Sequence, residues 1–280
     1  TTLNKMLNRF HMWFPGGIVL GSLISKFMTD GGMAWQTQVW VMMVPTIAYA
    51  VLFFGKAFPK PSVEGVTSVG SNIKAMFSPV FIFLFFAMAL TAISEFGPQQ
   101  WVGLIMSKSG ASPMLILALT TGVMAVGRFF AGPVVKALGQ TGVLLGGAIF
   151  ASIGVFMFST VTGPMAYVAA LVFAIGVCYF WPVMVGAVAQ RVPLSGALGM
   201  SIIGGVGMFS TAIFQPIIGG WIDTARADQG AAGLAGDALE LAAGQETLQK
   251  MVMFPGILIV LFIIFFIWQK GVKPAGEAAH

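Results

Sequence analysis

The sequence predicts an all-α membrane protein with eight transmembrane helices. Its 280 residues are 58% hydrophobic and only 8% charged, and the mean hydropathy is +0.92. Soluble domains carry charge on about a quarter of their residues, so this chain has too little charge to cover a surface that faces water. The apolar residues also form blocks of about 18 or more with almost no charge, which is the pattern of membrane spans.

Eight such blocks follow one another along the chain. Each has about 20 or more residues, enough at about 1.5 Å per residue to cross a hydrocarbon core about 30 Å thick. The third block is long for a straight crossing. The expected spans are residues 8–28, 34–55, 78–106, 112–135, 141–160, 164–188, 197–221 and 251–270.

One polar segment divides these spans into two groups. GKAFPKPSVEGVTSVGSNIKAM, residues 55–76, is rich in Pro, Gly and Ser, as linkers are. It leaves two spans before it and six after it. A division of two and six is unusual for a complete membrane protein, and the chain opens at a polar TTLNK without Met. We therefore expect a truncated N-terminus.

The basic residues predict how the chain is oriented. An even number of spans places both termini on one side, and cytoplasmic termini satisfy the positive-inside rule. This orientation also explains the net charge of +5 without nucleic acid as a partner. The inner basic residues are Lys5, Arg9, Lys56, Lys60, Lys74, Lys136, Arg191, Lys270 and Lys273, and the outer ones are Lys26, Lys108, Arg226 and Lys250.

The rare residue types exclude several kinds of chemistry. Cys178 is the single cysteine, so neither a disulfide framework nor a cysteine metal site is possible. His280 is terminal and His11 stands alone, which leaves little from which to assemble a metal centre or a catalytic triad. An enzyme needs convergent nucleophiles, acid–base groups or metal ligands. We expect no enzyme activity, no metal and no cofactor.

Glu95 is the strongest candidate for a functional residue, because it is the only acidic residue inside an expected span. A charge at the centre of a span costs about 2.5–3.5 kcal/mol on insertion scales, so a retained charge usually faces a cavity or a partner. A carboxyl in such a place can take up and release a proton as its surroundings change. The alternative is a hydrated carboxylate near the outer end of the helix.

The residues after Glu95 support a polar site. Gly97 and Pro98 predict a broken helix, whose freed backbone groups need protein or cavity water. Gln99 and Gln100 offer neutral donors and acceptors, and Trp101 offers a flat ring. Hydrogen bonds and ring stacking together suit a sugar-sized polyol. Anchoring at the membrane interface is the alternative role for Trp101.

Four further residues are weaker candidates. Tyr179 and Trp181 lie in an aromatic cluster that either stacks on a substrate or packs the core, and Gln215 before Pro216 is expected to line a cavity. Arg128 could pair with a carboxylate. An arginine at the inner part of a span more often snorkels to the interface or bonds carbonyls at helix ends, so we favour a structural role.

Several segments resemble the major facilitator superfamily, and within it the sugar and fucose–proton symporter branch. LNRFHMWFPGGIVLG (7–21) resembles the start of helix five, and ISEFGPQQWVG (93–103) resembles helix seven. The stretch from CYFWPVM to GGWID (178–223) resembles helices ten and eleven. GPVVKALGQT (132–141) echoes the cytoplasmic G-x-x-x-D-R-x-G-R-R signature. Gly132 and Gly139 match it, but Lys136 replaces the Asp.

The resemblance implies eight helices that correspond to helices five to twelve of a twelve-helix fold. Residues 1–55 would be the end of the N-terminal half, 56–76 the cytoplasmic linker, 77–272 the six-helix C-terminal half and 273–280 a cytoplasmic tail. The first four helices of the same chain would be missing partners. Helices five and eight of the family meet across the halves, and Gly132, Lys136 and Gly139 would belong to the gate region with Arg128, Gly97 and Pro98.

The function that this resemblance implies is secondary active transport by alternating access in a bacterial-type inner membrane. Proton-coupled uptake of a sugar or similar small polar solute is expected, with Glu95 as the proton site. Glu95, Gln99, Gln100, Trp101, Tyr179, Trp181 and Gln215 are the expected substrate contacts. An exporter of drug-like or other organic solutes is an alternative, although FPGGIVLG does not match the drug-antiporter signature. A receptor or scaffold that does not transport is a further alternative.

Overall fold

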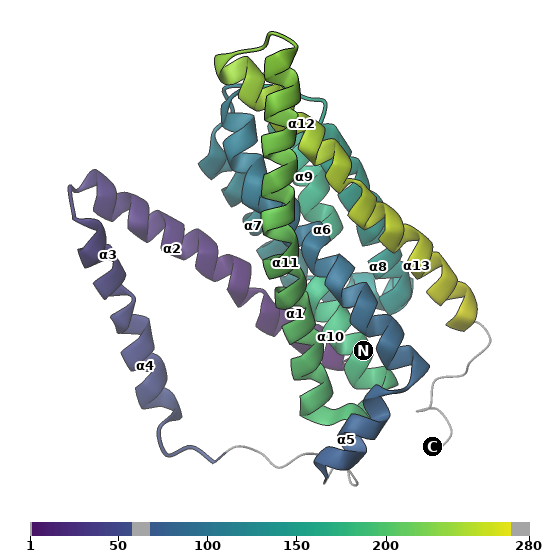
Figure 1. Ribbon diagram of the computed structural model, residues 1–280. Helices are drawn as coiled ribbons and strands as arrows, with labels where there is room; N and C mark the ends of the chain where they lie inside the picture. Colours follow the sequence, from purple (N-terminus) through teal and green to yellow (C-terminus); the bar gives the residue numbers. More distant parts are fainter. Residues whose placement is uncertain (1, 58–67, 270–280) are drawn as a thin grey trace.

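The structure, a computed structural model, describes residues 2–57 and 68–269, and these form helices and connecting turns only (Figure 1). Lys60, Lys270, Lys273, His280 and the expected tail 273–280 lie outside the described residues. The N-terminal helices are α1 (Thr2–His11), α2 (Trp13–Asp30), α3 (Trp35–Val41), α4 (Met43–Phe53) and α5 (Val69–Met76).

The remaining helices pack into a bundle around α6. It contains α6 (Pro79–Ser107), α7 (Pro113–Phe129), α8 (Ala131–Phe158), α9 (Met165–Val177), α10 (Phe180–Arg191), the short 3₁₀ turn η1 (Pro193–Ser195), α11 (Gly196–Ala231), α12 (Gly236–Met251) and α13 (Met253–Gln269).

Six helical stretches of the described residues are long and apolar enough to cross a membrane. The expected count of eight is therefore not reached, for two local reasons. The first expected span corresponds mainly to α2, whose 18 residues include the charged Lys26 and Asp30 and are therefore less apolar. The fourth is α7, with only 17 residues. The six are Trp35–Phe53, Pro79–Ser107, Ala131–Phe158, Met165–Arg191, Pro193–Ala231 and Gly236–Trp268.

Two bundle helices begin where the sequence places a Ser-Pro pair. The backbone N–H of Phe81 donates to the Ser78 hydroxyl at 3.3 Å, and that of Leu115 donates to Ser112 at 3.4 Å. Serine caps an orphan N–H of the first turn, and a proline in that turn has no N–H that needs a partner. These caps explain why the expected starts at residues 78 and 112 differ by only one residue from those observed.

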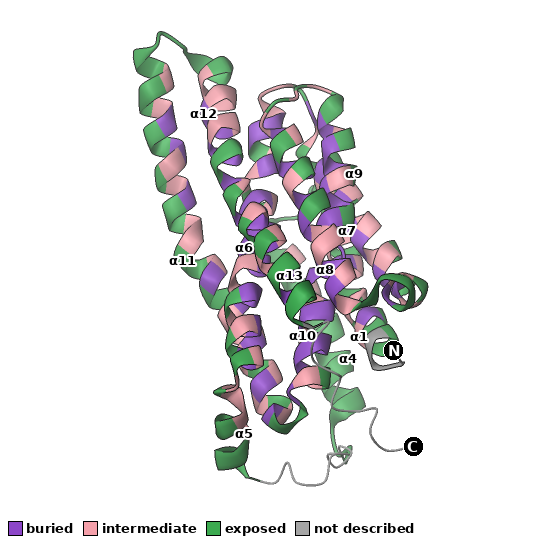
Figure 2. Cartoon of the chain, turned by 90° about the vertical axis from the view of Figure 1, so that its right-hand side faces the viewer, coloured by how far each residue is buried: buried purple, intermediate pink, exposed green. Residues whose placement is uncertain are grey.

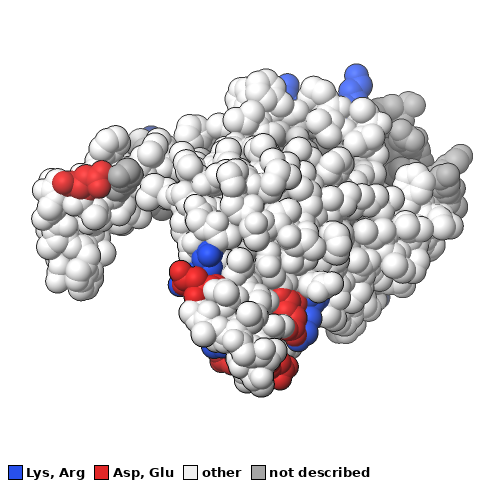
Figure 3. Space-filling view, turned by 90° about the horizontal axis from the view of Figure 1, so that it is seen from above, with Lys and Arg blue, Asp and Glu red and all other residues white. Residues whose placement is uncertain are grey.

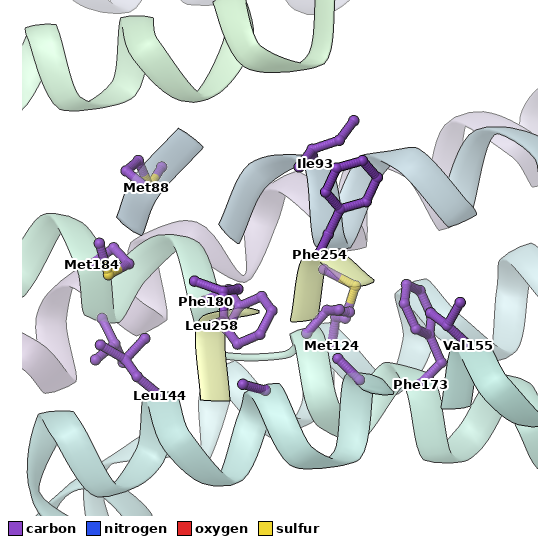
Figure 4. Packing of buried hydrophobic residues seen from close by; sticks show 14 of the residues in the cluster. Met88, Ile93, Met124, Leu144, Val155, Phe173, Phe180, Met184, Phe254 and Leu258 are labelled. Atoms are coloured by element: carbon purple, nitrogen blue, oxygen red, sulfur yellow. The ribbon is translucent and has the colours of Figure 1, made fainter. Parts of the chain in front are cut away.

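The core of the bundle lies where α6, α8, α9, α10 and α13 face one another (Figure 2). Its largest side chains are aromatic, aliphatic and methionine residues with almost no exposed surface. Figure 4 shows how they interdigitate between helices that are far apart in the sequence. They include Met88, Ile93, Met124, Leu144, Val155, Phe173, Phe180, Met184, Phe254 and Leu258.

The N-terminal helices are arranged differently. α1 packs against α7, α8 and α10, and α2 packs against α7. The contact between α2 and α7 brings the first and fourth expected spans together. α3 instead contacts α2 and α4, and α3 and α4 lie well apart from the bundle (Figure 1); none of their described residues is buried.

Charged residues gather where α11 and α12 meet (Figure 3). Arg226 contacts both carboxylate oxygens of Glu240 at 2.8 Å and Asp223 at 2.7 Å. Lys108, just after α6, pairs with Asp237 at 2.9 Å, and this carboxylate raises the pKa of the Lys108 ammonium. α11 has 36 residues, which at about 1.5 Å each exceeds a hydrocarbon core about 30 Å thick.

Candidate functional site

Glu95 and Arg128 form an ion pair inside the bundle. Glu95 lies on α6 and Arg128 near the end of α7, and Oε1 of the carboxylate is 3.6 Å from Nη2 of the guanidinium. The two side chains are 1% and 2% exposed, respectively. Removing two charges from water is costly unless they compensate each other. The pair therefore explains how each charge is tolerated, and it rules out a hydrated Glu95.

Arg128 also binds the ends of two other helices. Its Nε donates to the carbonyl of Cys178 at 2.6 Å, and Nη1 donates to the carbonyl of His11 at 3.2 Å. His11 ends α1, and Cys178 follows the end of α9. Carbonyls at helix ends lack partners within their own helix. The favoured structural role of Arg128, bonding such carbonyls, is present, whereas snorkelling to the interface is not.

The pair retains hydrogen-bonding capacity that no described residue uses. Oε2 of Glu95 and Nη2 of Arg128 are both buried, and neither has a hydrogen-bond partner among the described residues. Buried polar atoms without partners are uncommon in folded proteins. The free carboxylate oxygen can accept a proton, which makes Glu95 a candidate proton site.

Tyr179 and Trp181 follow the end of α9 but face different neighbours. The Tyr179 hydroxyl donates to the carbonyl of Gly127 at 3.0 Å, next to Arg128. The Trp181 ring lies edge-on to Phe96, with centroids 5.9 Å apart, and it packs where a Cβ at Gly207 would be 3.0 Å from the ring. These contacts match the core-packing alternative for the aromatic cluster.

Gln99 and Gln100 line a different part of the bundle, a cavity of about 180 Å³. Thr120, which is 3% exposed, reaches the same cavity from α7, and its hydroxyl has no hydrogen bond to a described residue. No feature of the sequence distinguishes Thr120, because a threonine in an apolar helix is common. None of the described residues that line the cavity is charged; its other residues are Val102, Gly103, Pro113, Ile116, Leu117, Phe158 and Phe173.

Trp101 and Gln215 do not line that cavity, because they bind each other. The indole Nε1 of Trp101 donates to Oε1 of Gln215 at 2.8 Å, and Nε2 of Gln215 donates to the carbonyl of Phe96 at 2.8 Å. Gln215 thus ties α11 to α6 on both sides of Pro98. The expectation that it lines a cavity is not supported, since both its oxygen and its nitrogen bind α6 and it lines none of the described cavities.

The helix around Gly97 and Pro98 is continuous, which corrects the expected break. α6 runs through Pro98 without interruption. Proline in a helix interior removes one backbone hydrogen bond and usually kinks the helix. Neighbouring helices can compensate for this loss in a membrane, and the bond from Gln215 to Phe96 gives the backbone beside Pro98 an additional partner.

Substituting Gln215 by methionine tests this tie. The change keeps the size of the side chain but leaves the Trp101 indole N–H and the Phe96 carbonyl without their partner. We expect a loss of about 1 kcal/mol in the free energy of unfolding, the scale of hydrogen bonds between membrane helices. Thermal unfolding in detergent measures the loss. Gln99→Met, which removes an amide without a hydrogen bond to a described residue, should change stability much less. Equal effects of the two substitutions would contradict the role of Gln215.

Gly132, Lys136 and Gly139 occupy the junction between α7 and the straight part of α8. The expected loop is mostly helical, and only Gly139 interrupts it, with φ 68° and ψ 167°. Such a φ favours glycine, which explains the match to the signature at this position. Gly132 lies beside Lys5 of α1. Lys136 is exposed and forms no ion pair with a described residue.

Together these features define the class of the protein, an all-α integral membrane protein with a charged pair in its interior. No family model matches the sequence, and no curated protein or solved structure matches it.

Proposed function

We propose that this chain is the larger part of a secondary active transporter of the major facilitator type. It would sit in a bacterial-type inner membrane with cytoplasmic termini and take up a sugar or similar small polar solute together with protons. In this proposal its helices correspond to helices five to twelve of the family, and the first four helices complete the transporter.

The observation that carries the proposal is the buried pair of Glu95 and Arg128. A structural bundle in lipid has no need of an ionisable residue in its interior, and such residues usually mark a pathway for a substrate or a proton. The pair joins α6 to α7 and reaches α1 through the His11 carbonyl. A proton that binds Glu95 would therefore alter contacts among helices that must move during alternating access.

The cavity beside Gln99 and Gln100 supports a neutral substrate. It offers two amides and the Thr120 hydroxyl together with the rings of Phe158 and Phe173. Amides and hydroxyls bind the hydroxyl groups of a polyol, and aromatic rings cover its apolar face. Since no charged side chain lines the cavity, a strongly charged solute would lack compensation there.

Uptake into proteoliposomes under an imposed pH gradient tests the proposal. The complete protein should concentrate at least one member of a panel of sugars and polyols. Glu95→Gln should lose concentrative uptake, because an amide cannot carry the proton, and should retain exchange of solute across the membrane. Asp228→Asn, a charge removal at an exposed position of α11, is the matched control and should transport normally. The proposal fails if no solute accumulates, or if Glu95→Gln still accumulates solute.

A further inference from the structure

We infer that Arg128 is a positioning residue that couples the charge of Glu95 to the backbone at the junction of α9 and α10. This junction consists of Cys178 and Tyr179, which lie between the last residue of α9 and the first of α10. The inference rests on the proposed role of Glu95 as the proton site and adds the residue through which a proton there acts.

Arg128 connects three helical segments through one guanidinium group. One guanidinium group contacts the Glu95 carboxylate on α6, the Cys178 carbonyl at the junction and the His11 carbonyl at the end of α1. The guanidinium is planar and its donors have fixed directions. A shift of the group toward or away from one partner therefore changes its bonds to the other two.

The end of α7 packs closely against the junction of α9 and α10. A Cβ atom at Gly127, the residue before Arg128, would lie 2.5 Å from Sγ of Cys178. The Tyr179 hydroxyl donates to the Gly127 carbonyl at 3.0 Å. The backbone of α7 at Gly127 thus contacts the side chains of both junction residues, the short Cys178 thiol and the rigid Tyr179 ring. Movement of Arg128 and its backbone is transmitted to Cys178.

The charge of Arg128 is balanced only while Glu95 is ionised. The ionised Glu95 neutralises Arg128, whereas a protonated Glu95 leaves a buried cation that only carbonyl dipoles compensate. An unpaired buried charge is strongly destabilising. The guanidinium then gains by moving toward water, which breaks its bond to the Cys178 carbonyl. The junction opens when Glu95 is neutral and closes when Glu95 is charged.

Few other ionisable groups lie near this pair. His11 and Arg9 approach from α1. Nδ1 of the His11 ring donates to the Leu7 carbonyl of its own helix at 2.8 Å, and the exposed Arg9 lies over the Phe129 ring at 5.2 Å. Cys178 and Tyr179 belong to the junction itself. The charged residues of α11 and α12 lie in the outer cluster, whereas Lys136 of α8 and Arg191 of α10 lie near the Gly139 kink, and the described part of α13 has none.

The only cysteine of the sequence reports on the junction. Cys178 is 2% exposed, so N-ethylmaleimide can react with it only when the junction opens. The experiment measures this rate for the purified, reconstituted protein and for Glu95→Gln, from mildly acidic to mildly alkaline pH. N-ethylmaleimide is used at concentrations where the rate no longer rises with concentration, so that opening of the junction limits the reaction. The ratio of the two rates is then the readout, because a rate limited by opening does not depend on the ionisation of the thiol, which lies close to Glu95.

The expected result is a ratio that depends on pH. At alkaline pH the wild type should react about tenfold more slowly than Glu95→Gln, as local opening is suppressed, and at acidic pH the two rates should converge. Glu95→Asp, which keeps the charge, should follow the wild type, and His11→Gln, which keeps the backbone carbonyl, should do so too. The same ratio is measured for Arg128→Lys with and without Glu95→Gln. It should not depend on pH, since an ammonium group cannot hold all three partners of the guanidinium.

Two results would overturn the inference: a ratio that is constant across pH, or a pH dependence that survives in Arg128→Lys. Denaturation in dodecyl sulfate gives the reaction rate of the unfolded form of each variant. A variant that already reacts at this rate before denaturation is unfolded. If Arg128→Lys is unfolded, the pH profiles of the wild type, Glu95→Gln and Glu95→Asp decide whether the inference holds. The outcome is separate from that of the transport experiment. Proton-dependent uptake with a constant ratio refutes only the coupling, and a pH-dependent ratio without uptake refutes only the transport function.

Discussion

Replacing Arg128 by methionine should lower the free energy of unfolding by about 3–5 kcal/mol, the cost of removing one partner of a buried ion pair. The substitution preserves much of the volume of the side chain but leaves the Glu95 carboxylate, 1% exposed, without a counter-ion. Two helix-end carbonyls, those of His11 and Cys178, lose their donor as well. Thermal unfolding in detergent at neutral pH is the measurement.

Two further proteins identify the cause of this loss. Arg128→Met combined with Glu95→Gln should recover part of the stability, because no buried charge remains, but not all of it, because the two carbonyls are still unpartnered. Arg9→Met is the control: Arg9 is exposed and lies over the Phe129 ring at 5.2 Å, so its loss should cost less than about 1 kcal/mol. If Arg128→Met is no less stable than Arg9→Met, the buried pair does not hold the bundle together.

Replacing Gly176 by alanine should be of comparable severity. A Cβ at Gly176 would collide with the backbone nitrogen of Ala151 and lie 2.7 Å from its Cα. Neither atom can move without shifting α8, and overpacking of this kind costs about 3 kcal/mol at the upper end of its usual range. α8 and α9 cross here with their backbones in contact, as small residues permit in membrane proteins. Reduced expression and a lower unfolding temperature are the expected signs.

A matched glycine lies on α8 itself. A Cβ at Gly146 would have no neighbour within 4 Å, so Gly146→Ala should leave stability unchanged or raise it slightly through the better helix propensity of alanine. Similar unfolding temperatures for Gly146→Ala and Gly176→Ala would show that α8 and α9 do not approach as closely as described.

Much of the helical architecture could be predicted from the sequence, because local features decide where helices start. Ser78 with Pro79 and Ser112 with Pro113 mark two starts, and the third expected span, 78–106, is nearly identical to α6, Pro79–Ser107. Other boundaries depend on packing. The last expected span begins at residue 251, but the helical region already begins at Gly236, where a polar, Ala-rich segment packs against α6 and α11. Hydropathy alone cannot reveal such a segment.

The candidate site was only partly predictable. Glu95 and Arg128 could each be identified as charges in apolar segments, but their pairing depends on how α6 and α7 pack. The same holds for Trp101 and Gln215, which are 114 residues apart in the sequence and share a hydrogen bond. The role of the Cys178 carbonyl could not be predicted either, because nothing in the neighbouring sequence marks the end of α9 there. Contacts between distant residues were the part that periodicity and composition could not supply.

The paired helices α11 and α12 have a practical consequence for imaging. A small membrane protein enclosed by a detergent micelle offers few features by which single particles can be aligned. Here Lys108 at the end of α6 pairs with Asp237 of α12, and Arg226 of α11 pairs with Glu240 of α12, so that the three helices are linked at one end of the bundle. Because this linked end differs from the other, it distinguishes the two poles of each particle and provides a place to attach an antibody fragment as an alignment marker.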